Sequence, residues 1–195
     1  MRSRHDLGKN LIMALEKEKL KTQIEFAFSW VQYPGDWCLS GSNEGKEPIL
    51  LKEAFRGKKD WKSLDPEFLD SAPGGFSSAL SFFSDEAFHF YLQAYLIADI
   101  DSKLEETNPI FNLTYGLTEE DKNKRINPKR YGERTWWDAA LYKFSIFNQE
   151  ECRSIMAYLE FKMALGDEFD NPQIKEALEN YWYERAGKKI GHKAA

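Results

Sequence analysis

The sequence predicts an all-α protein with at most one short strand or hairpin. The β-branched residues that favour strands number only 17, made up of one Val, 11 Ile and 5 Thr. Leucine (19) and alanine (16), which lose little side-chain freedom in a helix, together outnumber them twofold. A buried parallel sheet would need runs rich in Val and Ile, and the chain has none. We therefore expect a single irregular helical domain.

The first helix is expected over residues 9–32. Its apolar stripe begins at Leu11, Ile12 and Leu15 and resumes at Ile24. Between the two parts lies the charged stretch 16–21, which has little to bury. We expect residues 1–22 to form a charged helical arm that projects from the domain or docks elsewhere.

Two shorter helices follow a turn-rich loop over residues 36–47. Pro48 suits the first position of a helix that ends at Gly57, because proline has no amide hydrogen to leave unpaired there. Asp65 can cap a single turn that begins at Pro66, since its carboxylate accepts hydrogen bonds from the free amides of a helix start.

The central helix of the domain is expected over about residues 85–103. Ser84 can cap it, and apolar side chains then cover nearly its whole circumference up to Ile100. A helix that is apolar all round is buried. Only Glu86, His89 and Gln93 form a narrow polar line along it.

The second half of the chain continues with one extended segment and three helices. The segment 110–117, after Asn108-Pro109, is the candidate for the one strand. Thr135 can cap a helix over 136–144, and Asn148 with Glu151 makes a capping box for the next. That helix and a last one, from Asn171 to Gly187, are expected to form an antiparallel hairpin over the central helix. The predicted domain thus covers residues 23–187, and residues 188–195 form a polar tail.

Four stretches together resemble an uncharacterised, mostly bacterial protein family that is known as a domain of unknown function. They are KEAFRGKKDWKSLDPEFLD (52–70), LSFFSDEAFHFYLQAYLIADI (80–100), RYGERTWWDAA (130–140) and EECRSIMAYLEF (150–161). The resemblance covers about residues 23–183. It implies one domain over that range and no particular activity, cofactor or catalytic residue.

Composition limits where the protein acts. Its formal net charge is −5 and its apolar runs are only a few residues long, far below the roughly 20 that a membrane helix needs. The run 11–15 is too short for the core of a signal peptide. Cys38 and Cys152 lie in unlike contexts without metal-ligand spacing, as expected of reduced thiols. These features predict a cytoplasmic protein that does not enter a membrane.

His89 is the main candidate for chemistry. Glu86 and His89 have the i, i+3 spacing of di-metal helix bundles, but those sites need two such pairs, and the chain has three histidines in all. No metal or cofactor is therefore predicted. His89 could act as a general base oriented by Asp85 or Glu86. The structural alternative is a histidine at the edge of a buried helix, paired with a neighbouring acid.

The candidate binding residues are aromatic and basic. Residues 122–134 hold six cations against one anion, a pattern that can contact nucleic acid, but the acidic charge of the whole chain argues against that partner. Aromatic residues and arginine also dominate protein interfaces, which favours a protein partner. The candidates near turn-forming segments are Trp37, Arg130, Tyr131, Arg134, Trp136 and Trp137.

Two hypotheses about function follow. The first is a non-enzymatic, cytoplasmic protein-binding module, favoured because no catalytic constellation is visible. The alternative is a small-molecule enzyme or sensor with an acid/base cluster of Asp85, Glu86 and His89 at the start of the central helix. The sequence leaves open whether the protein is an enzyme and what its oligomeric state is.

Overall fold

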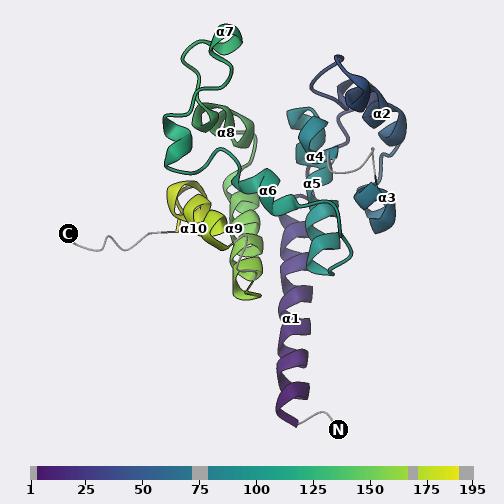
Figure 1. Cartoon of the computed structure of the whole chain (residues 1–195). Helices are drawn as coiled ribbons and strands as arrows, with labels where there is room; N and C mark the ends of the chain where they lie inside the picture. The colour runs from purple at the N-terminus through teal and green to yellow at the C-terminus, as the bar shows by residue number, and fades with distance from the viewer. Residues whose placement is uncertain (1–3, 72–78, 167–170, 189–195) are drawn as a thin grey trace, which may run out of the picture.

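The computed structural model describes residues 4–71, 79–166 and 171–188. Helices form its framework, and the described residues contain no strand, only two isolated bridges, Ser40 with Phe83 and Arg125 with Thr135. The predicted all-α class is confirmed. Figure 1 shows α1 running up to the middle of the molecule, with α2–α5 on one side and α8–α10 on the other.

Helix α1 (Arg4–Ala27) packs against the other helices through its C-terminal part. Leu20, Ile24 and Ala27 are buried where it packs on α9 (Gln149–Ala164) and α5 (Asp85–Ile100). The rest projects beyond the other helices (Figure 1). The helix continues through the expected boundary at residue 22, but it ends five residues before the predicted Gln32. The Ser29 hydroxyl donates to the Phe26 carbonyl, and such local bonds compete with the helical ladder.

The first lobe contains η1 (Asp36–Cys38), α2 (Lys46–Phe55), η2 (Trp61–Ser63), α3 (Pro66–Ser71) and α4 (Ala79–Phe82). The prediction that Pro48 starts α2 was wrong, because the helix begins at Lys46. Pro48 is its third residue, where a backbone amide still has no partner within the helix.

Helix α5 is the buried centre of the fold. The Ser84 hydroxyl accepts a hydrogen bond from the Ala87 amide at 3.0 Å, as the sequence predicted, and 12 of the 16 residues of α5 are buried. The helix ends at Ile100 rather than near 103. Ser102 adopts φ 57°, a left-handed conformation that cannot continue a right-handed helix.

The predicted extended segment over 110–117 was wrong. Residues Pro109–Thr114 form helix α6, because the Asn108 side chain caps it by accepting from the Phe111 amide at 3.0 Å. The Leu113 carbonyl accepts from the indole nitrogen of Trp182 at 2.9 Å, which ties α6 to the C-terminal helices. Asn-Pro is therefore a cap followed by a first helical position, and this local signal outweighs the strand-favouring residues after it.

The second lobe contains η3 (Glu120–Lys122), α7 (Pro128–Tyr131), α8 (Trp136–Phe144), α9, α10 (Asn171–Ala177) and α11 (Tyr183–Arg185). Both predicted caps are confirmed, since Thr135 and Asn148 each make a capping box. The last helix carries a π-helical turn, Leu178–Trp182, which packs on α9. Residues 189–195 of the expected polar tail lie outside the described residues.

Candidate functional site

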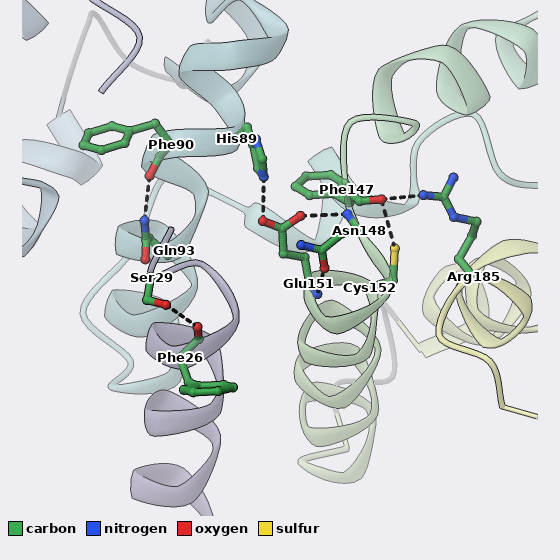
Figure 2. Close-up of polar contacts among 10 residues, drawn as sticks. All are labelled: Phe26, Ser29, His89, Phe90, Gln93, Phe147, Asn148, Glu151, Cys152 and Arg185. Atoms are coloured by element: carbon green, nitrogen blue, oxygen red, sulfur yellow. Dashed lines mark hydrogen bonds and ion pairs between the residues drawn. The ribbon is translucent and has the colours of Figure 1, made fainter. Parts of the chain in front are cut away.

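His89 is bonded to Glu151, a residue predicted from the sequence as part of a capping box but not as a partner of His89. Its Nε2 lies 2.8 Å from Oε1 of Glu151 on α9, and both side chains are buried (Figure 2). The other oxygen of Glu151 accepts from the Asn148 amide at 2.8 Å. Glu151 thus caps α9 and joins α9 to α5 at once.

The three predicted acid/base residues have three different partners. His89 faces Glu151 and is surrounded by the rings of Phe28, Trp30 and Phe147, with centroids 5.3–5.9 Å away. The Glu86 carboxylate accepts from the Cys38 thiol, with Sγ and Oε2 3.4 Å apart. Asp85 interacts electrostatically with Lys143. Four pockets formed by the described residues are lined by other side chains and not by His89.

One cavity lies between α4, α6 and α8. It measures about 340 Å³ and is open to solvent on one side. Most of its lining is aromatic or small and apolar, with a single charged side chain. The lining residues are Ser81, Phe111, Asn112, Tyr115, Trp136, Ala139, Ala140, Lys143 and Phe144.

Lys143 is the charged group of this cavity. Its ammonium lies 4.0 Å from the centroid of the Phe88 ring, and within the described ranges no carboxylate lies within the 4.0 Å of an ion pair. Burial lowers the pKa of Lys143 to about 8, against a smaller opposing effect of Asp85. Burial likewise raises the pKa of Asp85, a shift that the charge of Lys143 partly offsets.

The predicted binding residues are divided between separate places. Trp136 lines the cavity and packs edge-on against Tyr115, with centroids 5.0 Å apart. Trp137 lines a different pocket, beside Tyr181, and lies under the Lys122 ammonium. The α8 helix therefore directs its two tryptophans into different pockets.

The remaining predicted binding residues lie on the surface. The Arg130 guanidinium covers the exposed Tyr131 ring in α7, and Arg134 covers the ring of Tyr142. Trp37 is 83% exposed in η1, which precedes α2. Figure 1 draws α2 and α7 on opposite sides of the molecule, so these candidates do not make one continuous surface.

A second exposed surface is the outer part of α1. Leu11, Ile12 and Leu15 are each about 60% exposed, and Met13 and Phe26 are exposed as well. Leu11, Leu15 and Phe26 follow each other at helical spacing on the face opposite Leu20 and Ile24. We call Leu11, Ile12, Met13, Leu15 and Phe26 the arm surface. The arm itself was predicted from the sequence, but the predicted binding residues all lie outside it.

Ion pairs account for the acidic residues near the end of α5. Asp99 accepts from Lys162 on α9 at 2.9 Å, and Asp101 from Lys21 on α1 at 3.0 Å. In the part of the chain that the structure covers, no three His, Cys, Asp or Glu side chains form a group that could hold a metal ion. No helix within the described ranges is both long and apolar enough to cross a membrane.

The fold and the two surfaces define an all-helical domain that has a small aromatic cavity and a projecting N-terminal helix. The chain belongs to a family of unknown function (DUF6714), whose model matches residues 16–186. This match confirms the predicted resemblance to a family of unknown function, and it starts seven residues earlier, within α1. No curated protein and no solved structure matches the chain.

Proposed function

We propose that the protein is a non-enzymatic, cytoplasmic protein-binding module whose docking element is the arm surface of α1. The observation that carries this proposal is the exposure of Leu11, Ile12, Met13 and Leu15 on the projecting part of a helix whose C-terminal part packs on α9 and α5. Most of the stability of helices in proteins comes from tertiary packing of an apolar face, so a projecting helix gains from a partner. Large contiguous apolar patches are typical of interaction sites.

The arrangement of the arm surface favours a partner with an apolar groove. Successive helix positions are about 100° apart, so Leu11, Ile12 and Met13 point in three directions around the axis. A second helix in a simple pair would cover one of these directions, whereas a groove covers several. The adjacent residues 16–19 alternate Glu and Lys, which calls for a groove whose rim carries both signs of charge.

The cysteines support an environment that keeps thiols reduced. Cys38 and Cys152 are both free and buried, and they do not form a disulfide. Burial raises the pKa of the Cys38 thiol, and that of Cys152 to about 11, which lowers the reactive thiolate fraction of each. The two thiols are thus suited to packing rather than to catalysis.

The experiment places a photo-crosslinking amino acid at position 12 of the tagged chain in its native cell, and at position 49 as the control. Ile49 is a comparably exposed aliphatic residue on α2. We expect one protein to be cross-linked from position 12 and not from position 49. Identical adducts from both positions would overturn the proposal.

The identified partner is then purified and titrated against three forms of the chain. The Leu11→Glu/Leu15→Glu variant is expected to bind at least 100-fold more weakly, and Ile49→Glu as tightly as the wild type. Both variants should keep the wild-type melting temperature, because exposed substitutions change stability by only about 0.5 kcal/mol. Wild-type affinity in the double variant would contradict docking of a groove-bearing partner on the arm surface. The same conclusion would follow if sedimentation showed that the chain forms a homodimer and that the double variant is monomeric.

A further inference from the structure

We propose that the cavity between α4, α6 and α8 binds a small aromatic carboxylate, whose carboxylate group pairs with the Lys143 ammonium. This site is independent of the arm surface. The inference rests on three features of the cavity: its size, its aromatic walls and the cation among them, which has no carboxylate partner in the described part of the chain.

The size and walls of the cavity select a small, flat ligand. A volume of about 340 Å³ is at the lower end of the range for small-molecule sites and suits a single ring or a fused pair. Phe111, Tyr115 and Trp136 form a row of contacting rings, with centroids 5.1 and 5.0 Å apart. Phe111 and Tyr115 remain partly exposed, so an aromatic ligand would cover apolar surface that water now contacts.

Lys143 supplies the charge that selects an anion. Two other half-buried lysines each have a carboxylate partner, Lys21 with Asp101 and Lys162 with Asp99. Lys143 instead has the face of Phe88, a weaker partner for an ammonium than a carboxylate is. A ligand carboxylate would supply the missing ion pair in a site where burial strengthens it.

Ser81 of α4 adds a hydroxyl to the lining of the cavity. The Ser81 hydroxyl lies 3.4 Å from Oδ1 of Asn112, a long hydrogen bond that a closer acceptor can replace. The Asn112 amide nitrogen already donates to the Asn108 carbonyl. One ammonium and one hydroxyl match the two oxygens of a carboxylate, whereas a phosphate would leave oxygens without donors in an apolar site.

Affinity should depend on pH in one direction. Asp85 from α5 is the titratable group that acts on Lys143, and Tyr115 after α6 lines the same cavity; the charges of Glu86 and Arg134 act in turn on Asp85. Burial raises the pKa of Tyr115, so its phenol stays neutral well above pH 8. Binding should therefore weaken as Lys143 loses its proton, above pH 8, and stay nearly constant between pH 6 and 7.

The test is calorimetric titration of the purified full chain with benzoate, benzamide and inorganic phosphate at pH 7. We expect saturable binding of benzoate, with benzamide at least tenfold weaker, because benzamide has the same shape without the charge. Phosphate should not displace benzoate. Displacement by phosphate, or equal binding of benzamide and benzoate, would overturn the proposed ligand class.

Two variants and one control locate the site. Lys143→Met should weaken benzoate binding at least tenfold, and Ala139→Leu, which fills the cavity and keeps the charge, should do the same. Lys129→Met, at an exposed lysine of α7, should bind like the wild type. Wild-type affinity in both cavity variants, or no saturable binding of benzoate, phenylacetate or indole-3-acetate up to about 10 mM, would refute the site.

Discussion

Replacing Lys143 by methionine is expected to stabilise the protein at neutral pH. Methionine keeps the long aliphatic stem and fills a similar volume, but it removes an ammonium that burial disfavours. The pKa of Lys143 in the folded protein is about 8, compared with an ordinary value of 10.5. The unfolded chain therefore binds this proton more tightly than the folded one, and protonation favours unfolding.

The two pKa values set the magnitude. Their difference of about 2.5 corresponds to an upper limit of about 3.4 kcal/mol, at about 1.36 kcal/mol per pKa step. Lys143 is only half-buried, so solvent screening and the lost contact with Phe88 reduce the expected gain to about 1–2 kcal/mol. For a domain of this length that gain raises the melting temperature by about 2–8 °C.

Urea unfolding of both forms at pH 7 and pH 9.5 is the assay. Keeping Lys143 protonated in the folded protein lowers the free energy of unfolding by its full amount below about pH 8. This loss disappears as the pH rises towards 10.5, so the stability of the wild type should approach that of the variant. The gain at pH 9.5 should be less than half of that at pH 7. If the variant is less stable than the wild type at pH 7, or if its gain in stability is the same at both pH values, the claim that the buried Lys143 ammonium destabilises the fold is refuted.

Three further pairs of substitutions test the packing, each by urea unfolding. Glu151→Ala should lower the free energy of unfolding by about 3 kcal/mol, because alanine leaves both His89 and the Asn148 amide at the start of α9 without their partner. Glu151→Gln should lower it clearly less, and equal losses in the two variants would contradict this double role. Gly116→Ala should lower the free energy of unfolding by more than about 2 kcal/mol, because φ is +85° and the new Cβ would lie 2.8 Å from a backbone oxygen. Gly57→Ala has open space around it and should lower the free energy of unfolding by only about 1 kcal/mol. Leu20 is buried, so Leu20→Ala should lower the free energy of unfolding by about 2–4 kcal/mol, whereas Leu15→Ala at an exposed position should lower it by less than about 0.5 kcal/mol. Similar losses in the two variants would show that the outer part of α1 is packed.

Features that depend on neighbouring residues could be predicted from the sequence. The caps at Ser84, Thr135 and Asn148 each involve a side chain and an amide three positions later, so spacing alone identifies them. The buried central helix follows equally from its apolar circumference. The Asn108 cap was present in the same form, and the error there came from giving more weight to the residues after Pro109.

Features that depend on tertiary packing could not be predicted. His89 and Glu151 are 62 residues apart, so a search along one helix could propose only Asp85 and Glu86 as partners. Lys143 occupies the last turn of α8, where a lysine is ordinarily solvated, and the sequence does not reveal that α6 packs beside it to form a cavity. The apolar stripe of α1 could be predicted from the sequence, but the part of it that α5 and α9 cover could not.

Amide hydrogen exchange over residues 8–19 tests the central claim most directly, measured in the purified chain and in the complex recovered with the tagged protein. Leu11 to Leu15 are exposed in the chain alone, so their amides should exchange quickly there and at least tenfold more slowly in the complex. Residues of α2 should exchange at the same rate in both samples. Equal exchange over residues 8–19 in the two samples would show that the arm surface is not where a partner docks.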